Sequence, residues 1–190
     1  MEWILASASP RRKELLAELI ERFEIIPAKG EEKASPSLSP EELVKALAKG
    51  KAEEVATLPQ SRGKAVIGSD TVVAYEGEVL GKPKDEADAF RMLKMLSGKT
   101  HEVFTGVCIA RWRNGKLCFT TAADRTAVHF ETLTDEWIRE YIKSGSPMDK
   151  AGAYGIQDGG LVKKIEGSYS NVVGFPLELA GKMIGEIEEK

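Results

Sequence analysis

The dipeptide Asn114-Gly115 lies between two stretches rich in β-branched and aromatic residues, and it constrains the fold more than any other short segment. Asn-Gly favours a type I′ turn, whose twist matches that of the two strands it connects. The flanking residues predict a long antiparallel hairpin over about residues 102–130. In this register Arg111 pairs with Cys118, so Cys108 and Cys118 lie on opposite faces of the sheet and cannot form a disulfide.

The remainder of the chain alternates between strand and helix patterns. Trp3–Ala6 predicts a buried strand, a helix pattern follows it, and Phe23–Ile26 predicts a second strand. Ala65–Val73 predicts a third apolar strand, broken at its centre by polar residues. Together with the hairpin, this order predicts an α/β fold with a mixed sheet and flanking helices.

Composition narrows the class of protein. The chain has 190 residues, 42% of them hydrophobic, which fits one globular domain over residues 1–190. The formal net charge of −3 argues against polymeric nucleic acid as a partner, because such binding needs a clustered basic surface. No apolar run approaches the ~20 residues that span a bilayer, so we expect no membrane partner. With two unbridged cysteines and no signal-peptide pattern, the sequence predicts a soluble protein of the reducing cytoplasm.

The first predicted helix differs from the others in the charge of its first turn. Ser9 is a favourable N-cap, Pro10 a favourable first residue, and Arg11 and Arg12 follow. Other predicted helices begin with acids, in the segments Ser39–Glu42, Lys84–Glu86 and Thr134–Glu136. Because a helix N-terminus already carries partial positive charge, two arginines there are unfavourable unless an anion binds. The pattern predicts a phosphate site, with a solvated surface pair as the alternative.

Asp70 is the most informative acid because it interrupts an apolar strand. An unpaired carboxylate in such a strand would be costly to bury, so we expect a partner or an opening. Its neighbours Gly68 and Ser69 fit a strand end that faces a cleft. The alternative is a carboxylate that caps a helix or forms a hairpin turn.

Two lysines are candidate phosphate ligands. Lys82, in a Gly-Lys-Pro segment, follows the strand predicted after the Glu76-Gly77 turn, and its ammonium could neutralise phosphate oxygens. Lys51 lies on the second predicted helix beside Gly50, which interrupts that helix and is compatible with a close approach. The alternative for both is an ordinary solvated lysine.

Glu31 and Glu32 lie on a long loop before the second helix. With Asp70 they could offer oxygen ligands to a magnesium-like ion that also contacts substrate phosphates, or they form a solvated acidic loop. Zinc is not expected, because His101 and His129 are isolated in the sequence and the cysteines lack ligand spacing.

Two glycine-rich segments are the last candidate ligand-binding segments in the sequence. Asp149–Gln157 carries one amide side chain, Gln157, which can donate and accept hydrogen bonds at once and so suits the edge of a nucleobase. The alternative is a loop glutamine. Gly167–Gly174 predicts a tight turn with backbone donors, or the entry to a helix.

Taken together, these segments resemble the Maf family of nucleoside triphosphate pyrophosphatases, over nearly the whole chain. Five motifs appear in the order of the family: Leu5–Arg12 (LASASPRR), Gly68–Val73 (GSDTVV), Gly81–Pro83 (GKP), Asp149–Gln157 (DKAGAYGIQ) and Gly167–Gly174 (GSYSNVVG). Each motif is weak alone, but five in sequence are very specific.

The resemblance implies a twisted mixed sheet with flanking helices and a cleft between two lobes, similar to inosine triphosphate pyrophosphatases. It implies hydrolysis of a nucleoside triphosphate to the monophosphate and pyrophosphate, and a possible homodimer. A divalent cation of the Mg²⁺ or Mn²⁺ type is implied as the cofactor. A nucleotide-binding regulator of septum formation and cell division, with little turnover, is the alternative.

By motif position, the resemblance also assigns roles to single residues. Asp70 matches the general base, and Glu32 with Asp70 matches the metal-binding acids. The residues implied in phosphate binding are Ser7, Arg11, Lys51 and Lys82. The residues implied in base preference are Arg12, Thr71 and Gln157. This combination resembles the branch that acts on dTTP and UTP.

Overall fold

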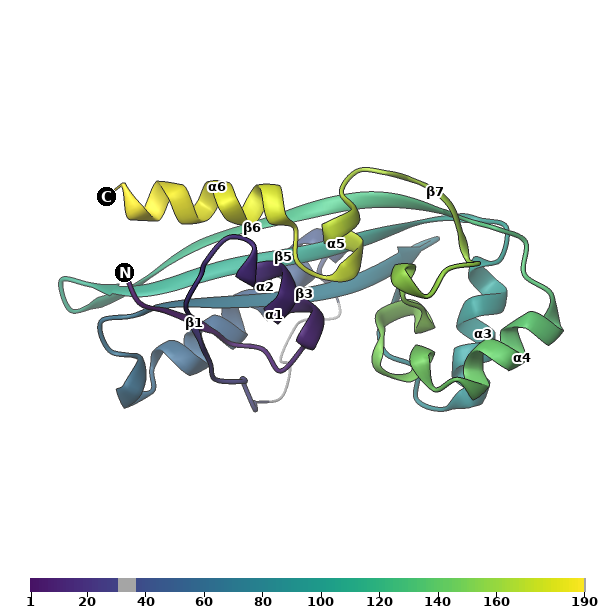
Figure 1. The fold of residues 1–190 in the computed structure, drawn as a ribbon, viewed down its shortest axis with the longest axis horizontal. Coiled ribbons are helices and arrows are strands. Elements are labelled where there is room, and N and C mark those ends of the chain that lie inside the picture. Colours follow the sequence, from purple (N-terminus) through teal and green to yellow (C-terminus); the bar gives the residue numbers. More distant parts are fainter. Residues whose placement is uncertain (31–36, 190) are drawn as a thin grey trace. The chain divides into compact units, whose positions relative to one another are not determined.

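Strands of both orientations pair in this computed structural model, which describes residues 1–30 and 37–189. Their order is β2-β1-β3-β5-β6-β7, and β4 pairs with β3 (Figure 1). β1 is parallel to β2 and β3, whereas the β3–β4 and β6–β7 pairs are antiparallel. The strands are β1 (Trp3–Leu5), β2 (Glu24–Ile25), β3 (Ala65–Tyr75), β4 (Glu78–Leu80), β5 (Thr100–Arg113), β6 (Lys116–Phe130) and β7 (Val162–Glu166). The predicted α/β fold with a mixed sheet is confirmed.

The helices begin where the sequence predicts. Ser9, Ser39, Asp85 and Thr134 each cap a helix with a side-chain oxygen, and Ser39 forms a capping box with Glu42. The α-helices are α1 (Pro10–Ala17), α2 (Pro40–Ala56), α3 (Glu86–Leu96), α4 (Asp135–Lys143), α5 (Tyr169–Val173) and α6 (Leu177–Glu188). Short 3-10 turns are η1 (Pro59–Ser61), η2 (Ser146–Asp149), η3 (Ala151–Ala153) and η4 (Ile156–Asp158). None of the helices in the described ranges is long and apolar enough to cross a bilayer.

Residues group into two compact units whose segments alternate along the chain. Unit 1 comprises Met1–Asp70, Thr105–Asp124 and Gly174–Lys190, and unit 2 comprises Thr71–Phe104 and Arg125–Val173. Strands β3, β5 and β6 each contribute residues to both units. A single domain over residues 1–190 stays a prediction.

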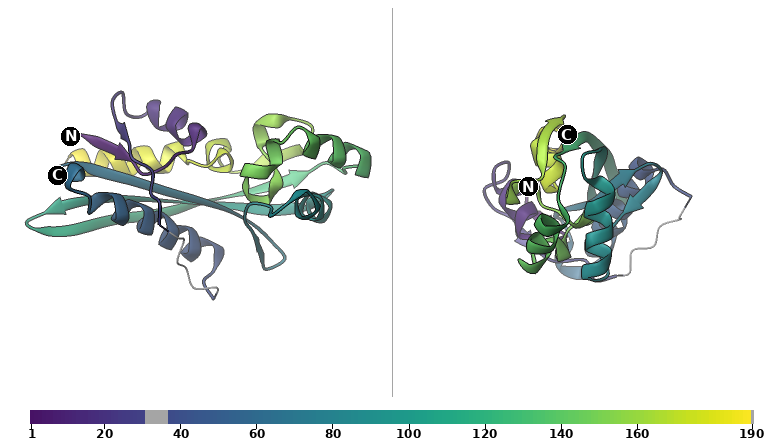
Figure 2. Two further views of the ribbon diagram at one scale, coloured as in Figure 1. Left: turned by 90° about the horizontal axis from the view of Figure 1, so that it is seen from below. Right: turned by 90° about the vertical axis from the view of Figure 1, so that its right-hand side faces the viewer.

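Unit 1 is built in layers around its part of the sheet. Helices α1 and α6 cover one face, where Leu16 and Met183 pack with Leu5 of β1. Helix α2 covers the other face, where Ala52 packs with Ile4 (Figure 2). Because neighbouring residues of a strand point to opposite faces, Ile4 and Leu5 belong to different halves of this core.

Unit 2 has its own apolar core. Helices α3 and α4 lie side by side, with Leu93 and Ile138 both fully buried (Figure 1). Val73 of β3 and Tyr154 of the glycine-rich segment belong to the same cluster. The buried ring of Tyr154, three residues before Gln157, therefore anchors the glycine-rich segment in the core of unit 2.

The hairpin predicted from Asn114-Gly115 is confirmed. Both residues have positive φ, 49° and 74°, as a type I′ turn requires, and the turn joins β5 directly to β6. Cys108 is buried, Cys118 is exposed, and both are free thiols, as the predicted register requires.

Two predictions about backbone breaks are wrong. Gly50 does not interrupt α2, which continues from Pro40 to Ala56. Asp70 does not end a strand or form a turn, because β3 continues from Ala65 to Tyr75. In both cases packing between α2 and β3 outweighs the local preference of single polar or glycine residues.

Candidate active site

In unit 1, the Nζ atom of Lys51 forms an ion pair with Oδ1 of Asp70. Lys51 lies on α2 and Asp70 on β3, and their side chains are 21% and 10% exposed. The buried carboxylate thus has the partner that the sequence led us to expect. The alternative of a solvated Lys51 is wrong, because this lysine faces the sheet.

Glycines on two neighbouring strands let α2 come this close. A Cβ on Gly68 would lie 2.3 Å from the carbonyl oxygen of Ala48 and 2.7 Å from the amide nitrogen of Ala52. On β5, a Cβ on Gly106 would lie 2.3 Å from the carbonyl oxygen of Val44. By contrast, a Cβ on Gly50 would meet nothing within 4 Å, so Gly68 and Gly106 rather than Gly50 permit the close approach.

The N-terminus of α1 has the predicted form. Ser9 accepts a hydrogen bond from the amide of Arg12 at 3.5 Å, and the first turn contains no acid. The hydroxyl oxygen of Ser7, itself buried, accepts from the amide of Ser9 at 3.2 Å and from Arg12 Nη1 at 3.5 Å. Arg11 is half-buried beside them. The structure therefore brings Ser7 and both arginines together at one helix start.

The carbonyl oxygen of Gly174 connects this helix start to β3. It accepts a hydrogen bond from Arg12 Nε at 2.9 Å and from the hydroxyl of Ser69 at 3.4 Å. Ser69 is fully buried next to Asp70. The sequence analysis named Ser69 only as a neighbour of Asp70 that fits a strand end. Its contact with a residue 105 positions away leaves no local signal.

In unit 2, Gly152 joins two other motifs. Its amide donates to the carbonyl oxygen of Gly81 at 3.0 Å, immediately before Lys82. A Cβ on Gly152 would lie 2.8 Å from a methyl carbon of Val73, two residues after Thr71 on β3. The segments that carry Thr71 and Lys82 thus both meet the glycine-rich segment. The side chain of Lys82 is exposed and Thr71 is half-buried.

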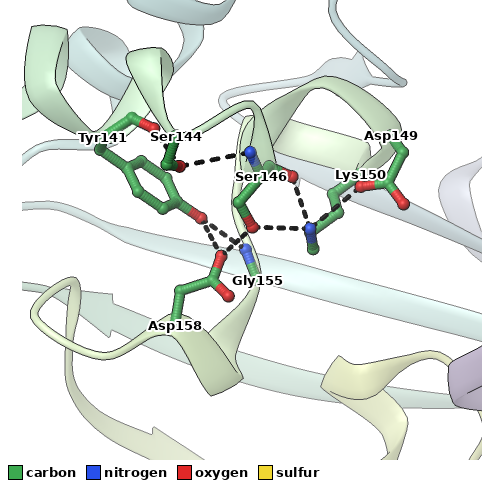
Figure 3. Close-up of polar contacts among 7 residues, drawn as sticks. All are labelled: Tyr141, Ser144, Ser146, Asp149, Lys150, Gly155 and Asp158. Carbon is green, nitrogen blue, oxygen red and sulfur yellow. Dashed lines mark hydrogen bonds and ion pairs between the residues drawn. The ribbon is translucent and has the colours of Figure 1, made fainter.

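Gln157 lies on the turn η4 and its side chain is exposed. A polar cluster includes the two ends of this turn (Figure 3): Tyr141, Ser144, Ser146, Asp149, Lys150, Gly155 and Asp158. Sequence reasoning missed Tyr141 and Asp158, because their contact joins a helix to a loop that pattern analysis treats separately. The one available signal was the position of Asp158 next to Gln157.

The segment Gly167–Gly174 is a helix entry. Within unit 2, Nδ2 of the buried Asn171 donates to the carbonyl oxygen of Val103 at 3.1 Å and to Oγ1 of Thr126 at 2.9 Å. Thr126 in turn donates to the carbonyl oxygen of Ser168 at 3.1 Å. Asn171 therefore holds α5 against β5 and β6.

His101 and Tyr154 form a further buried pair that sequence reasoning did not identify. The imidazole Nε2 of His101 lies 2.7 Å from the hydroxyl of Tyr154, and both rings contact Phe130 edge to face. Burial, followed by the nearby His129, lowers the pKa of His101 to about 3. The imidazole is therefore neutral at physiological pH.

Glu31 and Glu32 lie outside the described residues. The described residues just before them are held by α2, because the amides of Lys29 and Gly30 donate to the two carboxylate oxygens of Glu54 at 2.7 Å and 2.9 Å. Within the described ranges, no three His, Cys, Asp or Glu side chains are grouped as metal ligands.

Comparison with known proteins agrees with the resemblance drawn from the motifs. The family described as Maf-like protein matches residues 2–187. A protein of Thermococcus gammatolerans named dTTP/UTP pyrophosphatase is 51% identical over 183 residues, covering 95% of this chain and 94% of that protein. A protein of Geotalea uraniireducens with the same name is 53% identical over 177 residues, covering 92% and 89%.

Comparison with solved structures shows that other proteins share this fold. The Ham1 protein of Staphylococcus aureus matches with a TM-score of 0.56 at 14% identity, covering 100% of both chains. A HAM1 protein of Coxiella burnetii matches with a TM-score of 0.50 at 15% identity, covering 98% of this chain and 99% of that chain. The motifs, the fold and these sequence matches together show that the chain belongs to the Maf family.

Proposed function

We propose that the protein hydrolyses dTTP and UTP to the nucleoside monophosphate and pyrophosphate. The observation that carries this proposal is the partly buried Lys51–Asp70 ion pair, because it places the carboxylate of the Gly68–Val73 motif beside a cation from helix α2. The names of relatives about 50% identical over nearly the full chain support the same reaction.

In this proposal, cationic and hydroxyl groups bind the triphosphate. Arg11 and Ser7 at the start of α1 combine side-chain donors with the partial positive charge of a helix N-terminus. Lys51 and Lys82 add ammonium groups. These contacts orient the α-phosphorus and neutralise the charge that develops on its oxygens, which is the main source of acceleration in phosphoryl transfer.

Asp70 is the proposed general base. It removes a proton from a water molecule as the water oxygen bonds to the α-phosphorus, and the bond to the β-phosphate bridging oxygen breaks to release pyrophosphate. Lys51 keeps the carboxylate oriented on β3 before the substrate arrives. A positioned general base contributes about 10²- to 10⁴-fold in rate.

A divalent cation of the Mg²⁺ or Mn²⁺ type is the proposed cofactor, held by Asp70 and Glu32. The carboxylate of Asp70 fits this role, since Mg²⁺ binds through one or two carboxylates together with substrate phosphates and water. When bound, the metal supplies charge neutralisation at the phosphate oxygens.

Arg12, Thr71 and Gln157 are the proposed determinants of base preference. The amide of Gln157 is exposed and can donate to one base atom while it accepts from another. Arg12 is held by the carbonyl oxygen of Gly174 and the hydroxyl of Ser7, so its planar guanidinium has a defined direction.

The experiment is to incubate purified protein and magnesium with dTTP, UTP, CTP, 7-methyl-GTP and modified pyrimidine triphosphates, and to measure monophosphate and pyrophosphate. The proposal predicts one pyrophosphate per dTTP or UTP consumed. Saturable binding without product would instead favour the alternative, a nucleotide-binding regulator of septum formation and cell division. A homodimer and a cytoplasmic location also stay predictions, and sedimentation and cell fractionation test them.

A further inference from the structure

The turn that carries Gln157 is fixed from outside by a single tyrosine. The hydroxyl of Tyr141, on α4, donates to Oδ2 of Asp158 at 2.5 Å and accepts from the amide of Gly155 at 3.0 Å (Figure 3). Gly155 and Asp158 lie at the two ends of the short turn that contains Gln157. One phenol oxygen therefore holds both ends of this turn.

A second group of side chains supports the same carboxylate. The hydroxyl of Ser146 donates to Oδ2 of Asp158 at 2.6 Å. The ammonium of Lys150 donates to the hydroxyl oxygen of Ser146 at 2.9 Å and contacts Asp149 at 3.0 Å. Because Lys150 occupies the acceptor side of the Ser146 hydroxyl, the proton of that hydroxyl is directed to Asp158.

Packing brings the lysine and the aromatic rings close to the turn. A Cβ on Gly155 would lie 2.8 Å from Cε of Lys150, so the lysine side chain packs directly against the turn. The ring of Tyr141 lies 5.1 Å from that of Trp137, one turn earlier on α4. Burial and the hydrogen bond to Asp158 raise the pKa of Tyr141, so the phenol keeps the proton that it donates.

Gln157 itself has no comparable support. Its side chain is exposed, and within the described ranges no hydrogen bond holds its amide. The backbone of the turn therefore sets the point and the Cα–Cβ direction from which this side chain extends, and the contacts of Tyr141 and Asp158 hold that backbone.

We propose that Tyr141 and Asp158 are positioning residues for nucleobase recognition, which hold the Gly155–Asp158 turn so that the Gln157 amide meets the edge of a pyrimidine. This inference rests on the proposed function, and it assigns a selectivity role to two residues outside the set implied by the family motifs. Preorganised polar groups of this kind change the affinity for the matching base more than the rate of the chemical step.

The test compares Tyr141→Phe with the wild type and with Tyr75→Phe. Tyr141→Phe keeps the ring and removes the hydroxyl. Tyr75→Phe is the matched control, since the Tyr75 hydroxyl donates to the side chain of its neighbour Glu76 at 3.0 Å and not to the turn. We expect KM for dTTP to rise about tenfold in Tyr141→Phe with kcat nearly unchanged, and the preference for dTTP over dATP to fall by the same factor. Tyr75→Phe should leave both unchanged.

Two variants of Asp158 give a second readout. Asp158→Asn keeps an oxygen that can accept from Tyr141 and should retain most of the selectivity, whereas Asp158→Ala should lose as much as Tyr141→Phe. The double variant of Tyr141→Phe and Asp158→Ala should lose no more than either alone, because both act on one turn. Melting temperatures show whether each variant folds. If Asp158→Ala does not fold, the two single variants Tyr141→Phe and Asp158→Asn still test the inference.

Binding of dTMP by calorimetry separates this inference from the proposed function. If the wild type binds dTMP but releases no pyrophosphate from dTTP, the proposed function fails, and weaker dTMP binding by Tyr141→Phe still supports the positioning role. Unchanged selectivity and dTMP affinity in Tyr141→Phe, with only a lower melting temperature, would overturn the inference and leave the proposed function intact. A wild type that binds no nucleotide would overturn both.

Discussion

The carbonyl oxygen of Ala48 lies 2.3 Å from the position that a Cβ on Gly68 would occupy, so helix α2 rests on the backbone of strand β3. Lys51 lies on the same turn of α2 and reaches Asp70, two residues after Gly68 on the strand. The geometry of the proposed catalytic pair therefore depends on the absence of a side chain at Gly68, a residue to which we assign no contact with substrate or metal.

Gly68→Ala should destabilise the fold and reduce turnover together. The new Cβ would clash with backbone atoms of α2, which cannot rotate away, and overpacking of this kind costs about 1–3 kcal/mol. The resulting shift of α2 would separate Lys51 from Asp70. Urea unfolding and pyrophosphate release measure the two effects.

Gly50→Ala is the matched control for this substitution. Gly50 lies on α2 itself, and a Cβ there would meet nothing within 4 Å. Alanine is a better helix former than glycine, so the free energy of unfolding should rise by up to about 1 kcal/mol with normal turnover. A Gly68→Ala variant as stable and active as Gly50→Ala would contradict the packing argument.

Lys51→Met should lower the free energy of unfolding, because it removes the cation from the ion pair with the buried Asp70. Loss of a charged hydrogen-bond partner costs about 1–3 kcal/mol. Adding Asp70→Asn should recover part of this loss, since a neutral amide is less costly to bury. The double-mutant cycle measures the coupling, and additivity within about 0.5 kcal/mol would show that the ion pair contributes nothing to folding.

Acid should destabilise the protein through His101. Folded His101 stays neutral down to about pH 3, whereas an unfolded histidine takes up a proton near pH 6.5. Between these values the unfolded state binds more protons, so the free energy of unfolding falls as the pH falls. One such group lowers it by about 1.4 kcal/mol between pH 7.5 and pH 5.5.

The variant His101→Gln isolates this effect. Glutamine keeps a polar side chain to contact the Tyr154 hydroxyl but does not titrate, so the pH dependence of urea unfolding should become shallower by up to one proton over this range. An identical slope in wild type and variant would assign the acid sensitivity to other groups.

Arg12→Lys should raise KM for dTTP by about tenfold with a smaller change in kcat. Lysine keeps the charge but cannot reproduce the guanidinium contact with the carbonyl oxygen of Gly174, so the cation loses its fixed direction. Arg22→Lys, an exposed substitution on the same unit, is the control. Equal kinetics for both variants would show that Arg12 needs only its charge.

Local sequence signals predicted the elements that local chemistry determines. The positive φ of Asn114 and Gly115 and the caps at Ser9 and Ser39 follow from the residues themselves, and the structure has them where expected. The register of the hairpin also follows from its turn, which explains why the cysteines were placed correctly.

Contacts between distant segments were the part that sequence alone did not reveal. Asp70 was predicted at a strand end because its charge interrupts an apolar run, yet Lys51 from α2 neutralises it in mid-strand. Tyr141 and Asp158 were missed for the same reason, since they meet only once α4 and the following loop are folded. Which residues meet in such contacts depends on how the helices and loops pack, and the periodicity and composition of the sequence do not show this.

The most direct test of the account is pyrophosphate release from dTTP by Asp70→Asn. Asparagine preserves the shape of the side chain but cannot accept the proton of the attacking water, so turnover should fall at least about a hundredfold while dTTP still binds. Undiminished turnover in a folded Asp70→Asn variant would contradict the assignment of Asp70 as the general base.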